Sequence, residues 1–222
     1  QVLAFLTRGY GQQRLLAKGV KRSTKTKFMP CIDLLEQGDL AFRPCLRNEG
    51  GLGILTEWRQ TEAFLGLRRH LNRWFAAQYA AEIIATMTEP DDPHPDLFDA
   101  LVKLLVGLSG GIPPVSQLIE FQTSLLHSAG LWPDLTRCVI CDRPAPKGRS
   151  AYFSAHQGGL VCRNCQPKLP ETRLVHASIL TALRDNQSTD PAARKILDLL
   201  DYMISQVMGR PTLMVSAAQW GL

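Results

Sequence analysis

The sequence lacks a hydrophobic run close to the ~20 residues that a membrane-spanning helix needs. Its mean hydropathy of −0.06 is that of an ordinary globular mixture. The first six residues, QVLAFL, include no Met, and they lack both the basic region and the small-residue cleavage site of a secretory signal peptide. We therefore expect no membrane partner and no signal peptide, and we expect the natural N-terminus to lie upstream of Gln1.

The sequence also lacks the short motifs that mark common enzymes. It has no GxxxxGK[ST] or GxGxxG loop for nucleotide phosphates and no HExxH motif. None of its histidines is followed two residues later by Glu, as the zinc deaminases require. Residues 107–111 fit the letters GxSxG, but they end a helical pattern, whereas the hydrolase motif joins a strand to a helix. We expect no enzymatic turnover.

Acidic residues are scarce at the front of the chain. Residues 1–73 contain 13 Lys and Arg against 6 Asp and Glu, whereas residues 74–222 contain 12 against 14. The formal net charge of +5 therefore arises entirely from the front part. This segregation predicts that the front part contacts a polyanion.

The positive charge is densest in residues 18–27, where five cations alternate with Ser and Thr. On a loop between strands, these cations and hydroxyls would bind phosphates. The alternative is a solvated loop that charge repulsion holds open. With two arginines nearby in sequence, the candidate DNA-binding residues are Arg8, Arg14, Lys18, Lys21, Arg22, Lys25 and Lys27.

Other residues could assist this binding. Aromatic rings at Phe5, Tyr10, Phe28 and Phe42 are candidate stacking platforms, although we expect Phe5 and Phe42 to pack in the core. A second basic cluster comprises Arg68, Arg69 and Arg73, which we place on the first helix, with Arg69 and Arg73 on one face. No base-reading motif is present, so binding should be largely independent of sequence.

The periodicity of the chain predicts an α+β fold. In residues 1–57, short apolar runs alternate with Gly and Pro, which is typical of a small antiparallel barrel. We place about four strands there, including one at 31–35, whereas an OB-like barrel has five. From residue 58 the apolar spacing is helical, with a first helix opening near 61 and continuing to 87. Further helices are expected at 95–110, 114–130, 176–185 and 191–208.

Residues 131–170 interrupt this helical domain of residues 58–222 with many Pro and Gly residues and too little apolar content to fold unaided. Two CxxC pairs, Cys138 with Cys141 and Cys162 with Cys165, are separated by 20 residues. This spacing is typical of a zinc ribbon, because two CxxC turns supply four thiolates to a tetrahedral Zn²⁺. Four thiolates leave no position for water, so we expect the zinc to be structural.

The alternatives to zinc are disulfides, an iron–sulfur cluster and a chance spacing of the cysteines. No secretory signal supports disulfides, and iron–sulfur clusters use other spacings. The remaining cysteines, Cys31 and Cys45, occur singly, and we expect both to be small buried residues of strands.

The order of these parts resembles the RecO family of bacterial recombination mediators. The resemblance covers essentially the whole chain and is carried by residues 6–11 (LTRGYG), 17–22 (AKGVKR), 52–57 (LGILTE) and 121–131 (FQTSLLHSAGL), followed by the CxxC pairs. It implies an N-terminal OB-fold DNA-binding domain, residues 1–57 here, followed by an α-helical domain that carries the zinc module. It also implies binding of single- and double-stranded DNA, annealing of complementary strands, and help in loading RecA onto strands coated by single-strand-binding protein.

The resemblance further implies two partners, RecR and the tail of single-strand-binding protein, and a place in the cytoplasm at the nucleoid. A different class of function stays open at this point, namely a zinc-ribbon protein that binds RNA or a ribosomal surface. A metal-dependent enzyme that acts on nucleic acid is disfavoured by the closed set of four cysteines.

Overall fold

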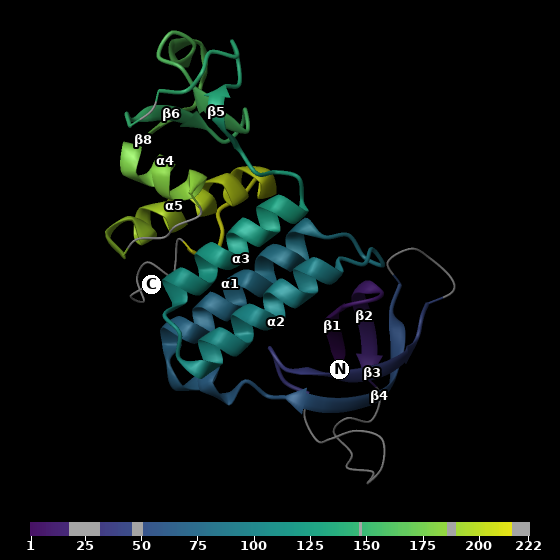
Figure 1. The fold of residues 1–222 in the computed structure, drawn as a ribbon. Helices are drawn as coiled ribbons and strands as arrows, with labels where there is room; N and C mark the ends of the chain where they lie inside the picture. The colour runs from purple at the N-terminus through teal and green to yellow at the C-terminus, as the bar shows by residue number, and fades with distance from the viewer. Residues whose placement is uncertain (18–31, 46–50, 147, 186–189, 215–222) are drawn as a thin grey trace. The chain divides into compact units, whose positions relative to one another are not determined.

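The computed structural model describes residues 1–17, 32–45, 51–146, 148–185 and 190–214 (Figure 1). Within these residues the backbone forms two four-stranded sheets and five α-helices, which confirms the predicted α+β class. The chain folds into two compact units, Gln1–Ile112 and Pro113–Leu222. In the described part of the chain, no helix is both long and apolar enough to cross a membrane.

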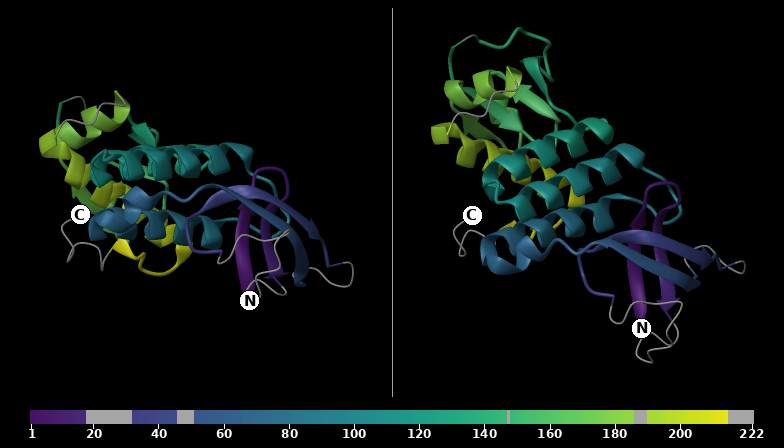
Figure 2. Two further views of the ribbon diagram at one scale, coloured as in Figure 1. Left: turned by 90° about the horizontal axis from the view of Figure 1, so that it is seen from below. Right: turned by 60° about the horizontal axis from the view of Figure 1, so that its bottom comes forward.

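The first unit begins with a sheet in the order β1-β2-β4-β3, formed by β1 (Val2–Thr7), β2 (Gly11–Ala17), β3 (Gln37–Arg43) and β4 (Gly53–Glu62). Two antiparallel pairs, β1–β2 and β3–β4, are joined by a parallel pairing of β2 with β4 over only three register positions. With so short a shared stretch, the β3–β4 ribbon crosses the β1–β2 hairpin rather than running alongside it (Figure 2).

The expected closed barrel is not formed by the described residues. A closed barrel requires the two outer strands, β1 and β3, to pair with each other or with a further strand between them. Among the described strands, neither pairing is present. The strand expected at 31–35 is also wrong in its described part, because a turn at Leu34 and Leu35 occupies this stretch and Leu35 has φ 58°.

The core of this sheet is a cluster of inward-facing side chains. Leu15 and Ala17 alternate with exposed Arg14 along β2, as expected for a half-buried strand. Trp58 on β4 is 5% exposed and extends the buried face beyond residue 57, so β4 continues to Glu62. The predicted domain end at residue 57 thus lies within a strand, and the functional division into 1–57 and 58–222 stays a prediction.

The helix expected from residue 61 is divided into two parts. A 3₁₀ turn, η1 (Leu65–Arg69), precedes α1 (Leu71–Met87), and extended His70 separates them. The break buries Phe64 and Leu67, each 1% exposed, which a continuous helix opening at Thr61 would not allow. Residues 61 and 62 belong to β4 instead.

Helix α2 (Pro95–Gly110) confirms the expected second helix and ends at Gly111, whose φ of 101° suits a helix cap. The GxSxG letters therefore lie at a helix end, as the sequence indicated. The Ser109 hydroxyl accepts a hydrogen bond from the Gly66 N–H at 3.2 Å. A Cβ on Gly66 would lie 2.1 Å from the Ser109 carbonyl oxygen, so the serine has a packing role here.

Polar side chains join the β1–β2 hairpin to the helices. The Gln12 side-chain amide donates to the Thr88 carbonyl oxygen at 2.7 Å, at the C-terminal end of α1. The Gln13 amide donates to the Asp91 carboxylate at 2.7 Å. Gly11, with φ 65°, lies so close to Asp92 that a Cβ would be 2.2 Å from its carbonyl oxygen. The hairpin is therefore fixed to the α1–α2 connection.

The second unit contains a sheet that the sequence analysis did not predict. Its order is β5-β7-β6-β8, with β5 (Asp134–Cys138), β6 (Ala151–Ser154), β7 (Gly159–Val161) and β8 (Arg173–Val175), and η2 (Gln166–Lys168) precedes β8. Helices α3 (Pro114–Ser128), α4 (Ala177–Arg184) and α5 (Asp190–Met208) confirm the three remaining predicted helices within two residues. Phe121, Leu126, Phe153, Leu197 and Leu200 are among the side chains buried in this unit.

Candidate metal centre and nucleic-acid surface

The second sheet brings the two CxxC turns together. Cys138 ends β5 and Cys141 lies in the turn after it, while Cys162 follows β7 and Cys165 directly precedes η2. Strands β5 and β7 pair in parallel, with Cys138 in register with Leu160. Because β5 and β7 are adjacent and parallel, the turns that follow them lie at the same end of the sheet, and the four thiols converge there.

The geometry of the four sulfur atoms fits a tetrahedral metal ion. All four Sγ atoms lie within 4.8 Å of one another, and those of Cys141 and Cys162 are 3.7 Å apart. Four ligands at Zn–S distances near 2.3 Å would be separated by about 3.8 Å. The predicted clustering of Cys138, Cys141, Cys162 and Cys165 is confirmed, and the identity of the ion stays a prediction.

The thiols of this cluster have opposed pKa shifts. Burial raises the pKa of Cys138, but backbone N–H groups, among them that of Cys162 at 3.3 Å, outweigh burial and lower it to about 6. The pKa of Cys165 is raised to about 12, chiefly by its contact with the Cys162 thiol and then by burial. The cluster thus favours the first negative charges and opposes the last, an opposition that a bound divalent cation would remove.

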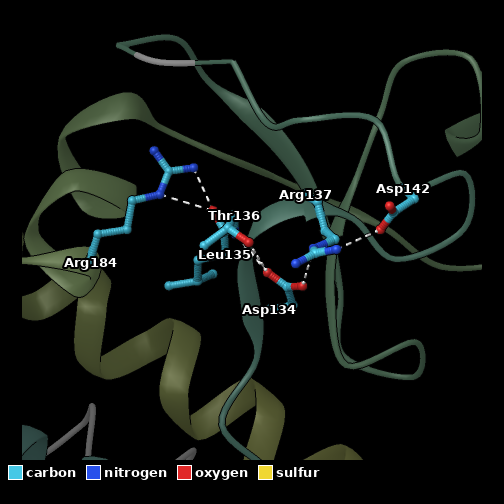
Figure 3. A network of polar contacts seen from close by, with 6 residues as sticks. All are labelled: Asp134, Leu135, Thr136, Arg137, Asp142 and Arg184. Carbon is cyan, nitrogen blue, oxygen red and sulfur yellow. Dashed lines mark hydrogen bonds and ion pairs between the residues drawn. The ribbon is translucent and has the colours of Figure 1, made fainter.

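A network of polar contacts holds β5 and the turn that carries Cys141 (Figure 3). The Asp134 carboxylate accepts hydrogen bonds from the Thr136 N–H and hydroxyl, both at 2.7 Å. Arg137 forms ion pairs with Asp134 at 3.3 Å and with Asp142 at 3.0 Å, so it links the strand to the turn.

Arg184 at the end of α4 completes this support. Its Nε and Nη2 atoms donate to the Leu135 carbonyl oxygen at 2.9 and 2.6 Å (Figure 3). The sequence analysis missed this residue, because one arginine in the last turn of a helix has no pattern that distinguishes it from a solvated cation. Only the folded structure shows that the Arg184 side chain contacts Leu135 on β5, which lies 49 positions earlier in the sequence.

Two of the predicted DNA-binding residues lie on the β1–β2 hairpin. Arg14 is exposed on β2 and has no ion pair within the described residues. Arg8, in the hairpin turn, donates two hydrogen bonds of 3.0 Å to the two carboxylate oxygens of Asp99. The other predicted contacts, Lys18, Lys21, Arg22, Lys25 and Lys27, lie outside the described residues, as does Phe28.

The aromatic candidates differ in exposure. Phe5 and Phe42 pack against the core cluster, as predicted, and the Phe5 ring lies 5.4 Å from that of Trp58. Tyr10 is 65% exposed and contacts Phe42 edge-on with ring centroids 5.6 Å apart. Tyr10 thus leaves an aromatic ring accessible on the hairpin that bears Arg8 and Arg14.

The second basic cluster does not share one helix face. Arg68 and Arg69 belong to η1, whereas Arg73 follows the break at His70. Arg68 forms an ion pair with Asp33 at 2.9 Å and lies over the Trp74 ring, 5.6 Å from its centroid. The predicted shared helix face of Arg69 and Arg73 is therefore wrong, because extended His70 lies between them and interrupts the helix.

The prediction for the remaining cysteines is wrong at Cys45. This residue is exposed and follows Pro44 beyond the end of β3, since a proline after the strand's last residue ends the pairing. Cys31 lies outside the described residues.

Comparison with known proteins gives consistent similarities over most of the chain. Residues 68–215 match the family described as "Recombination protein O C terminal". A protein of Rhodopirellula baltica named "DNA repair protein RecO" is 33% identical over 187 residues, which cover 83% of this chain and 67% of the relative. Proteins with the same name from Anaeromyxobacter sp. strain K and Bacillus pumilus are 29% and 26% identical, covering 95% and 94% of this chain and 85% and 83% of their own lengths.

Proposed function

Because this chain belongs to the RecO family, whose curated members are named for DNA repair, we propose that it is a recombination mediator. In this proposal it binds single- and double-stranded DNA and anneals complementary strands. With RecR, it helps to load RecA onto strands coated by single-strand-binding protein. The observation that carries the proposal is the similarity to RecO proteins across both units, up to 95% of the chain.

The N-terminal sheet is the proposed DNA-binding element, as part of an OB-like barrel. Annealing brings two polyanions together, so a protein that promotes it must neutralise phosphates while leaving the bases accessible. The hairpin offers an exposed cation at Arg14 and an exposed ring at Tyr10. Residues 18–27, which follow β2 in sequence, add five cations. No bond is made or broken in this process, so we propose that the protein acts without enzymatic turnover.

The cysteine cluster is the proposed site of a structural Zn²⁺. Cys138, Cys141, Cys162 and Cys165 would hold the ion, which would cross-link the turns after β5 and β7. Four sulfur ligands close the coordination shell, so the ion would stabilise the fold rather than activate water. The mutual approach of all four Sγ atoms to within 4.8 Å supports this assignment, because tetrahedral thiolate ligands of Zn²⁺ are separated by about 3.8 Å.

The proposed partners are RecR and the tail of single-strand-binding protein, and the proposed place of action is the cytoplasm, at the nucleoid. These assignments depend on family membership. A copurification of the chain with RecR would test the first partner directly.

The proposed activity is tested by strand annealing. Two complementary oligonucleotides, labelled with a fluorophore and a quencher, should anneal at least about tenfold faster with the protein than without it, because charge neutralisation removes the repulsion between the strands. The effect should vanish at high salt. An unchanged annealing rate, together with tight binding of structured RNA, would overturn the proposal in favour of an RNA-binding protein.

A further inference from the structure

A cavity of about 560 Å³ lies in the second unit, between α5, β8 and the segment after α5. Its volume is within the range of small-molecule sites, roughly 300–1,000 Å³. The cavity is separate from the cysteine cluster, since none of the four cysteines lines it. The lining residues that matter here are charged, aromatic or hydroxyl-bearing: Arg173, Arg194, Asp198, Tyr202, Ser205 and Arg210.

One face of α5 forms a wall of this cavity. Arg194, Asp198 and Tyr202 follow one another at intervals of four residues, and this spacing places their side chains along one side of a helix. The same side continues to Ser205, whose hydroxyl donates to the Tyr202 carbonyl oxygen at 2.8 Å. The opposite side of α5, with Leu197, Leu200 and Ile204, is buried. The polar side of α5 thus faces the cavity, while its apolar side is packed in the core of the unit.

Arg173 is held against this wall by an aromatic contact. Its guanidinium carbon lies 3.5 Å from the centroid of the Tyr202 ring, and Tyr202 is 6% exposed. Arg173 itself is exposed on β8. A guanidinium that already lies on an aromatic ring is preorganised, so a planar group from solvent can stack on it at little entropic cost.

The Tyr202 hydroxyl is an unexplained polar group. It is buried and has no hydrogen-bond partner within the described residues. Buried hydroxyls are almost always paired, and an unpaired one is unfavourable. This oxygen has almost no accessible surface, so a ligand in the cavity does not reach it, and Tyr202 contributes to the cavity through the ring that holds Arg173.

The mixture of charges restricts the ligand. Three arginines favour a phosphate, but Asp198 and Asp201 also line the cavity and would repel a simple anion. A nucleotide satisfies both, because its phosphate pairs with arginine and the amino group of its base donates to a carboxylate. Its base can also stack on a guanidinium plane.

We propose that this cavity binds one nucleotide of a single-stranded DNA, with the base stacked on Arg173 and the phosphate bound by Arg194. Asp198 accepts a hydrogen bond from the amino group of the base, so cytosine and adenine bind more tightly than thymine, which has no such group. This inference rests on the proposed function, since it assumes that the protein handles DNA strands. It adds a base-holding site that lies outside the N-terminal sheet.

The test is calorimetric titration of the full chain with dCMP and, in parallel, dTMP. Binding of dCMP should be at least about fivefold tighter than that of dTMP. Arg194→Gln and Arg173→Lys should each weaken dCMP binding by about tenfold, the second because lysine keeps the charge but loses the planar stack. The matched control is Lys195→Gln, which removes one exposed cation from the neighbouring position of α5 outside the cavity and should change the affinity less than about twofold.

A second variant separates the ring of Tyr202 from its hydroxyl. Tyr202→Phe removes only the inaccessible unpaired hydroxyl and keeps the ring under Arg173, so the chain should fold with unchanged or higher stability and bind dCMP with less than about twofold change in affinity. Equal dCMP binding by Arg194→Gln, Tyr202→Phe and Lys195→Gln would overturn the inference. So would equal affinity for dCMP and dTMP.

The proposed function has a separate readout, which is annealing by the unaltered chain. Normal annealing with no dCMP binding would overturn the nucleotide site alone. Conversely, dCMP binding that depends on Arg194, in a chain that anneals no strands, would support the site and overturn the proposed mediator activity.

Discussion

Each unit contains a four-stranded sheet, but different interactions hold the two sheets together. The N-terminal sheet has its own apolar cluster of Leu15, Ala17, Ile32, Leu55 and Trp58. It is also joined to helices far along the chain, as by Gln12 to Thr88 and Arg8 to Asp99. The sheet of the second unit has short strands of three to five residues, and its parallel β5–β7 pairing ends at the cysteine cluster.

This difference shows where each sheet is vulnerable. Packing in the first sheet is distributed over several strands and two helices, so no one side chain carries most of its stability. The second sheet also buries apolar side chains, among them Leu135, Phe153 and Leu160, but Cys141 and Cys165 lie in turns outside its strands, and one ion would cross-link these turns. Disruption of the metal centre and disruption of the hairpin should therefore have separable effects.

The largest effect is expected from removal of the proposed zinc ion. Structural zinc contributes about 10–16 kcal/mol of apparent binding free energy in zinc-finger peptides, so a chelator or Cys162→Ser should unfold residues 134–175. Hydrogen exchange should show lost protection in β5–β8 and unchanged protection in β1–β4. The control is Cys45→Ser, at an exposed cysteine outside the cluster, which should keep one zinc per chain by elemental analysis. Full protection in a metal-free chain would contradict this account.

A smaller effect is expected at the hairpin. Gly11→Ala places a Cβ 2.2 Å from the Asp92 carbonyl oxygen at a φ of 65°. It should destabilise the first unit by about 2–4 kcal/mol in denaturant unfolding, since both the close contact and the backbone conformation are unfavourable. Gly9→Ala is the matched control, because nothing lies within 4 Å of the added atom. Equal unfolding midpoints for the two variants would show that the hairpin is not held in this way.

Loss of the Arg184 contact should cost less again. Arg184→Met keeps the aliphatic stem but leaves the Leu135 carbonyl oxygen without its two donors at 2.9 and 2.6 Å. The expected destabilisation is about 1–2 kcal/mol, confined to the second unit. Arg149→Met, at an exposed arginine without a described partner, is the comparison and should be neutral. A neutral Arg184→Met would mean that β5 does not depend on α4.

The smallest effect concerns the Arg8–Asp99 pair. The Arg8 guanidinium lowers the pKa of Asp99 below its ordinary value of 3.8 through a hydrogen bond. The contribution of the pair to stability is present above pH 3.8 and is lost as the pH falls through the lowered pKa. In a carbon-detected NMR titration, Arg8→Gln should return the Asp99 pKa towards 3.8. An unaltered Asp99 titration would show that the pair does not form in solution.

The cysteine cluster and most helices were predictable from sequence because their signals are local. Each CxxC turn is a local feature of a few residues. Pro95 and Pro114 mark helix starts by their fixed φ, and Gly111 marks a helix end because glycine readily adopts a positive φ. The helix expected from residue 61 failed for the opposite reason. Apolar spacing continued through His70, but burial of Phe64 and Leu67 against the rest of the unit decided the local conformation.

The second sheet and the cavity beside α5 were not predictable in this way. Strands of three or four residues, such as Gly159–Val161, are too short to show a period of two. Arg173 and Tyr202 are 29 positions apart, and only the folded chain brings the guanidinium over the ring. Sites that depend on such distant pairs have no sequence signature in a single chain.

The central claim, that positive charge at the front of the chain binds DNA phosphates, is tested most directly by the salt dependence of DNA affinity. The full chain should lose affinity steeply with salt, and the variant Lys21→Ala/Arg22→Ala/Lys25→Ala should flatten the log–log slope by about two units. The variant Arg149→Ala/Lys168→Ala/Lys195→Ala, which removes three exposed cations from the second unit, should keep the original slope. A slope that is unchanged in the first variant and flattened in the second would contradict the claim.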